Sequence, residues 1–365
     1  MKVAFVARKT LYSTPGGDTK QIEATALGLR QQGVTVDIFL AHQKPDYRDY
    51  DLLHFFNIIR PADILRHTSI AKTPYLVSTI YVKYGAIDGN QAGRLRQIIS
   101  SIISEDGMEY LKALGRWVFN REFPGSWRYL IRGHKNAIKQ VARRAAMLLP
   151  NSESEYRVFS TDYNLECPYR IIPNGVDKAA VTEHYQTADN YRNAIICMAR
   201  IEPLKNQLGL IRALNKTGIR VFIHGKASPN HHQYYNQCQH EAAENIQILP
   251  WLETSQLYPI YATARVHVLP SFFETTGLST LEAAALGCNV VITDRGYTRD
   301  YFGDDAWYCE PEDPASIRSA ITAAYEAPYN EAFRKRILEQ YTWDRAAEET
   351  LKAYEFVLQQ AAGKP

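Results

Sequence analysis

Short apolar runs alternate along this chain with longer stretches in which apolar and polar residues recur at helical spacing. This alternation is typical of parallel strands joined by crossover helices. It occurs as two successive series. Strands are expected in the first series at 2–7, 34–40, 51–56, 75–79, 146–150 and 170–173, and in the second at 194–199, 221–224, 246–249, 266–270 and 289–293.

The 365 residues exceed the usual content of one hydrophobic core, so the two series indicate two domains. A turn-rich stretch at 173–177 precedes a polar stretch at 178–193, which is suited to a linker. We therefore expect an α/β chain with one Rossmann-like domain at 1–175 and another at 176–345, facing a central cleft. A C-terminal helix at about 345–365 could pack back on the first domain.

Membrane-spanning and disulfide-stabilised classes are not indicated. No apolar run reaches the roughly 20 residues that cross a bilayer, and the start of the chain lacks the pattern of a secretory signal. A cytoplasmic location is therefore expected. The cysteines are odd in number and contain no Cys-x-x-Cys pair, so neither a disulfide framework nor a zinc site is predicted; they are Cys167, Cys197, Cys238, Cys288 and Cys309.

Two glutamates eight positions apart form the most informative pattern. Glu274 falls in the loop between the strand at 266–270 and a predicted helix at 278–286, and Glu282 falls in the first turns of that helix. A diphosphate at the helix start would meet free N–H groups and the positive end of the dipole, while the carboxylates could accept hydrogen bonds from sugar hydroxyls. Spacing alone favours a plainer interpretation, in which Glu282 supports the dipole and Glu274 is solvated.

A pair of cations opens the second series. Arg200 is predicted to end a strand and Lys205 to begin a helix, which places both at the carboxyl edge of the sheet. Together they could stabilise negative charge on a departing diphosphate without a metal. The alternative is that both are surface charges at a helix start. In the first series, Gly16 and Gly17 follow a strand and would let the backbone approach a ligand closely, although a structural turn is the simpler explanation.

These elements resemble, in the expected order, motifs of the retaining glycosyltransferases of family 4, which have the GT-B fold. Glu274 and Glu282 match the Glu-x7-Glu signature, and Arg200 and Lys205 match a Gly-Arg-x4-Lys-Asn element in which Ala199 replaces glycine. The Gly-Gly turn is similar to the N-terminal glycine loop of the family, and 172–177 is similar to its interdomain segment. Matching elements span most of the chain.

The resemblance implies catalytic roles for Arg200, Lys205 and Glu274. The two cations would stabilise the leaving diphosphate, and the carboxylate would orient the donor sugar. Glu282 would contact the ribose, and the backbone at the two glycine turns would approach the phosphates. In this chain Glu-Thr-Thr-Gly stands where the family usually has Glu-Gly-Phe-Gly. The further donor-binding residues would therefore be Gly16, Gly17, Thr276, Gly277, Leu278 and Glu282. No cofactor is expected, and the nucleoside diphosphate sugar is the donor substrate.

The expected function is metal-independent transfer of a sugar, with retention, from a nucleoside diphosphate sugar to a hydroxyl acceptor, as in surface polysaccharide or glycolipid synthesis. Many relatives carry a histidine where this chain has Tyr81 and Lys83, and no catalytic role is assigned to either. His54 could touch substrate or be structural. A non-catalytic GT-B partner of another enzyme that binds a glycan or a nucleotide sugar remains the alternative, and a GT-B epimerase or phosphorylase is a third.

Two further patterns concern metals and charge. The pair Asp49–Asp51 lacks companion ligands, and the adjacent His231 and His232 would point in different directions on a helix, so both pairs are interpreted as structural. Residues 91–145 carry a net charge of +7 against +3 for the whole chain, interleaved with aromatic residues. This segment could rest on anionic lipid at the inner face of the membrane or receive a phosphorylated acceptor. A solvated helical face is the alternative, and no motif for nucleic acid accompanies the charges.

Overall fold

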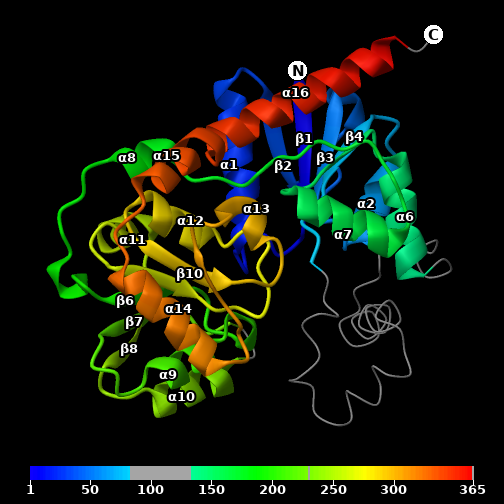
Figure 1. The fold of residues 1–365 in the computed structure, drawn as a ribbon. Helices are drawn as coiled ribbons and strands as arrows, with labels where there is room; N and C mark the ends of the chain where they lie inside the picture. The colour runs from blue at the N-terminus through cyan, green and yellow to red at the C-terminus, as the bar shows by residue number, and fades with distance from the viewer. Residues whose placement is uncertain (83–132, 229–230, 364–365) are drawn as a thin grey trace. The chain divides into compact units, whose positions relative to one another are not determined.

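The computed structural model describes residues 1–82, 133–228 and 231–363 (Figure 1). The chain divides into two compact units, the first formed by Met1–Pro173 with Asp344–Pro365 and the second by Asn174–Trp343. Each unit contains one parallel β-sheet with helices packed on it (Figure 1). The expectation of two Rossmann-like α/β domains is confirmed.

The sheet of the first unit has five parallel strands in the order β2-β1-β3-β4-β5. Val3 of β1 lies opposite Val36 of β2 on one side and Leu52 of β3 on the other. Strands buried on both faces explain the continuous apolar runs in the sequence. The strands are β1 (Lys2–Ala7), β2 (Thr35–Leu40), β3 (Leu52–Phe56), β4 (Tyr75–Ser78) and β5 (Met147–Leu149).

Helices of the first unit include one from the far end of the sequence. The C-terminal helix α16 brings Tyr354 to His54 on β3, with 2.6 Å between Oη and Nδ1, and Glu349 to Arg170 at 2.9 Å. These two contacts tie the helix to the first unit, one of them at the sheet. The described helices are α1 (Gly17–Gln31), α2 (Pro61–Thr68), α6 (His134–Arg144), α7 (Glu153–Tyr163) and α16 (Trp343–Ala362), with a 3-10 turn at Tyr47–Asp49.

The second unit has six parallel strands in the order β11-β10-β9-β6-β7-β8. They are β6 (Ile195–Met198), β7 (Val221–His224), β8 (Ile246–Leu249), β9 (Val266–Leu269), β10 (Asn289–Thr293) and β11 (Trp307–Cys309). The α-helices are α8 (Lys178–Thr182), α9 (Gln207–Leu214), α10 (His232–Glu241), α11 (Thr254–Tyr261), α12 (Leu278–Ala285), α13 (Thr298–Phe302), α14 (Pro314–Glu326) and α15 (Glu331–Gln340), with 3-10 turns at Asp189–Tyr191 and Pro203–Lys205.

Two local predictions were wrong. Residues 170–173 form no strand: Tyr169 makes an isolated bridge to Leu148, and the ladder stops at Pro150, whose carbonyl accepts from Ile172 N but which has no N–H of its own to donate. Residues 178–193 are folded rather than a linker, since they contain α8 and a 3-10 turn and bury the side chain of Val181 completely. One strand, β11, was missed because its short run is only partly buried and so lacks the continuous apolar pattern of the inner strands.

All five cysteines are free thiols. Cys197, Cys238, Cys288 and Cys309 are buried in the second unit, where they pack among its apolar side chains, whereas Cys167 in the first unit is half-buried. Burial raises the pKa of the Cys197, Cys238 and Cys309 thiols to about 12. They therefore behave as small core residues in the folded protein.

Candidate functional site

The loop before α12 is fixed by close backbone contacts. Gly277 is the N-cap of the helix with φ of 76°, and a Cβ there would lie 2.7 Å from Ile292 Cδ1. Glu274 is held by the segment after β10: its N–H donates to Arg295 O at 3.2 Å, and its carbonyl accepts from Tyr297 N at 2.9 Å. Gly296, with φ of 102°, passes so near that a Cβ would lie 1.9 Å from Glu274 O. These contacts restrict the backbone of Glu274 on both sides.

An ion pair between a partly buried lysine and a buried glutamate joins two of the predicted residues. Lys205 Nζ lies 2.5 Å from Glu274 Oε1, and the hydroxyl of Ser271 donates to the same oxygen at 2.6 Å. The side chains of Lys205 and Glu274 are 18% and 8% exposed. The interpretation of Glu274 as a solvated loop residue was therefore wrong. Because β6 pairs directly with β9, the segments that follow these strands bring the cation and the carboxylate together.

Lys205 was expected to begin a helix, but it closes the 3-10 turn, and α9 begins at Gln207. Asn206 between them has φ of 55° and caps α9, since its Oδ1 accepts from Gly209 N at 3.2 Å. Its Nδ2 donates to Pro270 O at 3.1 Å and to Pro311 O at 2.7 Å. Asn206 thus fixes Lys205 by linking its turn to the loop that leads to Glu274.

Arg200 lies two residues beyond the end of β6 rather than at its last position. Its guanidinium contacts Glu202, with Nη2 3.0 Å from Oε1, and its side chain is 46% exposed. Its carbonyl accepts from Gln207 Nε2 at 2.9 Å. The sequence pattern did not indicate Glu202, which is buried.

Other residues predicted to belong to the site lie around the start of α12. Asn174 Nδ2 donates to Thr276 Oγ1 at 3.0 Å, and Asn174 N donates to Tyr301 Oη at 3.0 Å. Glu282 is buried one turn into the helix. Burial raises the pKa of the neighbouring Tyr261, and the carboxylate of Glu282 raises it further.

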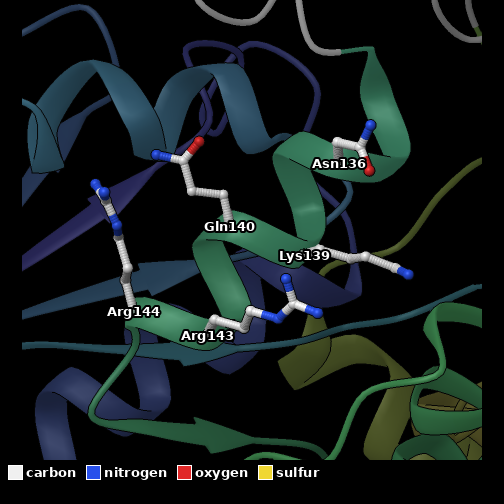
Figure 2. A pocket seen from close by; sticks show the side chains of 5 residues that line it. All are labelled: Asn136, Lys139, Gln140, Arg143 and Arg144. Carbon is white, nitrogen blue, oxygen red and sulfur yellow. The ribbon is translucent and has the colours of Figure 1, made fainter.

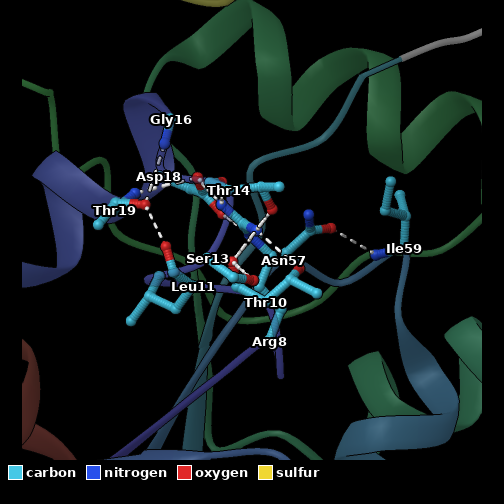
Figure 3. Close-up of polar contacts among 10 residues, drawn as sticks. All are labelled: Arg8, Thr10, Leu11, Ser13, Thr14, Gly16, Asp18, Thr19, Asn57 and Ile59. Atoms are coloured by element: carbon cyan, nitrogen blue, oxygen red, sulfur yellow. Dashed lines mark hydrogen bonds and ion pairs between the residues drawn. The ribbon is translucent and has the colours of Figure 1, made fainter. Parts of the chain in front are cut away.

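Gly16 and Gly17 belong to the first unit, at the N-terminus of α1, where Gly16 N donates to Thr19 Oγ1 at 3.0 Å. The loop before them is organised by Arg8, a residue that no motif indicated (Figure 3). Its guanidinium contacts Asp18 at 2.5 Å and Thr14 O at 2.8 Å. The glycine turn is therefore held by side chains of its own loop.

His54 and Tyr81 make their described contacts within the first unit. His54 is buried between Tyr354 and Ser78, and burial lowers its pKa to about 3. Tyr81 donates from its hydroxyl to Asp162 at 2.9 Å, while Lys83 lies outside the described residues. Within the described ranges no three His, Cys, Asp or Glu side chains are grouped to hold a metal ion.

The described part of the basic segment is helix α6. Five polar side chains line a shallow surface pocket on it, three of them cationic: Asn136, Lys139, Gln140, Arg143 and Arg144 (Figure 2). The rest of the basic segment, residues 91–132 with their aromatic residues, lies outside the described residues. Among the helices that the structure describes, none is long and apolar enough to cross a bilayer.

Comparison with known proteins agrees with this architecture. Residues 183–340 match the family model Glycosyl transferases group 1. Curated relatives include O-antigen chain mannosyltransferase B of Escherichia coli, 26% identical over 54% of this chain and 52% of the relative, and D-inositol 3-phosphate glycosyltransferase of Geodermatophilus obscurus, 28% identical over 59% of this chain and 54% of the relative. The chain thus spans about half the length of the curated relatives it matches.

Solved structures share the fold across the whole chain. Sucrose-phosphate synthase of Thermosynechococcus elongatus has a TM-score of 0.75 at 14% identity, with all of both chains covered. Anabaena HepE in complex with UDP and glucose has a TM-score of 0.62 at 15% identity over 99% of this chain and 98% of the other. Residues 183–340 are therefore similar to the glycosyl transferases group 1 family, and the chain has the fold of the GT-B glycosyltransferases.

Proposed function

We propose that this chain is a retaining, metal-independent glycosyltransferase of family 4 that moves a sugar from a nucleoside diphosphate sugar to a hydroxyl acceptor. The observation that carries the proposal is the buried cluster of Lys205, Glu274 and Ser271 at the carboxyl edge of β6 and β9, inside the group 1 domain. Ligands bind at this edge in open parallel sheets.

The chemistry follows from the charges. Breaking the bond between the anomeric carbon and the diphosphate oxygen leaves the electron pair on that oxygen, and the cations of Lys205 and Arg200 stabilise it. The acceptor oxygen attacks the same face of the sugar, and its proton passes to the departing phosphate, so no side-chain base is required. Both hydrogen bonds that the Glu274 side chain accepts in the described part of the chain go to Oε1. Its Oε2 then accepts from a hydroxyl of the donor sugar.

The remaining donor contacts lie around α12. No side chain caps this helix among the described residues, so the amides after Gly277, beginning with Leu278, can meet phosphate oxygens. Glu282 accepts from the ribose hydroxyls. Thr276, held by Asn174, shapes the site where relatives have phenylalanine. A role for Gly16 and Gly17 near the phosphates stays a prediction, since the Gly16 amide donates to Thr19 Oγ1 within its own turn.

The proposed acceptor class rests on a curated relative, and the proposed location rests on the charge of α6. A relative that is an O-antigen chain mannosyltransferase supports a role in surface polysaccharide or glycolipid synthesis. The cationic side chains of α6 support peripheral contact of 91–145 with anionic lipid at the cytoplasmic face of the membrane, because polybasic surfaces gain energy near anionic headgroups. Salt should then weaken binding to phosphatidylserine vesicles, and absence of binding at low salt would exclude this contact.

The activity can be tested before any acceptor is known. A thermal-shift screen with uridine, guanosine and adenosine diphosphate sugars identifies the donor, because a ligand that binds the folded form raises its melting temperature. Slow release of the nucleoside diphosphate from that donor then shows turnover, and NMR of the product with an added acceptor shows the anomeric configuration. Arg200→Ala or Lys205→Ala should each lower the rate about a hundredfold. Binding without turnover would favour a non-catalytic partner instead.

A further inference from the structure

The carboxylate of Glu202 is buried and contacts the guanidinium of Arg200. Its residue is 8% exposed, and both oxygens are engaged: Oε1 accepts from Arg200 Nη2 at 3.0 Å, and Oε2 accepts from the hydroxyl of Ser228 at 2.5 Å. A buried carboxylate keeps its charge only where partners compensate for lost water. Arg200 is therefore the cation that Glu202 holds.

Ser228 is in turn fixed by the backbone. Its N–H donates to Ile201 O at 3.2 Å, and Ile201 N donates to Lys226 O at 2.9 Å, so the segment after β6 is bridged to the segment after β7. The hydroxyl of Ser228 therefore has a set position relative to Glu202. Because Gln207 also binds the carbonyl of Arg200, this residue is held at its backbone and at its guanidinium.

Lys205 is held in the same manner. Glu274 binds its ammonium and also accepts from a serine hydroxyl, that of Ser271. Each cation thus has a buried carboxylate that a serine keeps in place. A guanidinium has five N–H donors and an ammonium has three, so each cation can keep its carboxylate and still donate to a phosphate oxygen.

We propose that Glu202 is a positioning residue, which holds the guanidinium of Arg200 ready to bind the diphosphate of the donor. This inference rests on the proposed function. Arg200 is about half exposed, and an unrestrained arginine would lose rotamer freedom when it binds a ligand. Glu202 restricts the guanidinium before the ligand arrives, at the expense of a negative charge near the site.

Two substitutions distinguish the positioning of the Arg200 guanidinium by Glu202 from the effect of the negative charge of Glu202. Glu202→Gln removes the charge, but its carbonyl can still accept from Arg200 and its amide can donate to Ser228. Glu202→Ala removes the charge and the contacts. Calorimetry with uridine, guanosine and adenosine diphosphate identifies the nucleotide that the unmodified protein binds. With it, Glu202→Ala should weaken binding about threefold to tenfold, the contribution of one hydrogen bond, whereas Glu202→Gln should stay within about twofold.

The outcomes distinguish the two proposals. In an Arg200→Ala background, Glu202→Ala should have no further effect on the dissociation constant, because coupled residues are not additive. Glu241→Ala, which breaks the exposed Arg212–Glu241 pair of the same unit, is the control and should not alter binding. Additive effects, or tighter binding by both Glu202 variants, would overturn the positioning role. No nucleotide binding, or unchanged binding by Arg200→Ala, would overturn the proposed function and this inference with it.

Discussion

The buried pair between Lys205 and Glu274 can be tested without any substrate. Lys205→Met removes the ammonium but keeps a side chain of similar length. Glu274, 8% exposed, is then left with the hydroxyl of Ser271 as the remaining partner described above. Removing one member of a buried pair costs 3–5 kcal/mol, and we expect about 3 kcal/mol because this hydroxyl remains. For a unit of this size, that corresponds to a fall in melting temperature of about 6–12 °C.

The reverse substitution should cost less. Glu274→Gln leaves an ammonium whose side chain is 18% exposed and therefore better hydrated, so we expect a loss of about 1 kcal/mol. The double variant contains no charge at either position, and its free energy of unfolding should exceed that of Lys205→Met alone. Urea unfolding followed by circular dichroism gives all four free energies of the cycle.

Additive losses in the double variant would refute this reasoning, since they would show that the charges do not interact. Equal losses from the two single variants would also contradict it, because the argument depends on the deeper burial of Glu274. Turnover provides a separate check. The double variant should regain stability but remain as inactive as Lys205→Met, because the cation is still missing.

Three further predictions concern pH, backbone and metal. Burial raises the pKa of Glu155 from 4.5 to about 7, so the folded state binds a proton more tightly than the unfolded state. Stability should therefore fall by up to about 3 kcal/mol as pH rises from below 4.5 to above 7, and Glu155→Gln should flatten this part of a urea-unfolding profile. Gly296→Ala should destabilise the second unit by more than about 2 kcal/mol, because its Cβ would overlap the carbonyl of Glu274. Gly218→Ala, at φ of 76° with open space around it, should cost only about 1 kcal/mol. Equal losses in thermal melts would contradict this. Excess EDTA should leave turnover unchanged, and a loss reversed by magnesium or manganese would refute metal independence.

The sequence predicted the central strands well because both of their faces are buried, which makes their apolar runs continuous. It did not predict β11 at Trp307–Cys309, whose short, half-exposed run carries little periodic signal. The start of α9 was misplaced because Asn206 adopts a left-handed backbone that depends on tertiary bonds to Pro270 and Pro311.

The sequence indicated which residues belong to the candidate site but not which of their side chains contact one another. Motif spacing indicated Arg200, Lys205 and Glu274, yet it could not show that Lys205 contacts Glu274, since that contact depends on β6 and β9 being neighbours. Glu202 meets Ser228 only because the segments after β6 and β7 are bridged. Such contacts arise from strand order, which local patterns do not encode.

The distribution of cysteines provides an intrinsic reporter of local unfolding. Four of the five thiols are enclosed in the second unit, where burial raises the pKa of each. A thiol-specific reagent can modify them only during transient opening, whereas the half-buried Cys167 reports on the first unit. Mass spectrometry of timed alkylation can therefore compare how often each unit opens in the unmodified protein, and nucleotide that binds the second unit should slow its labelling selectively.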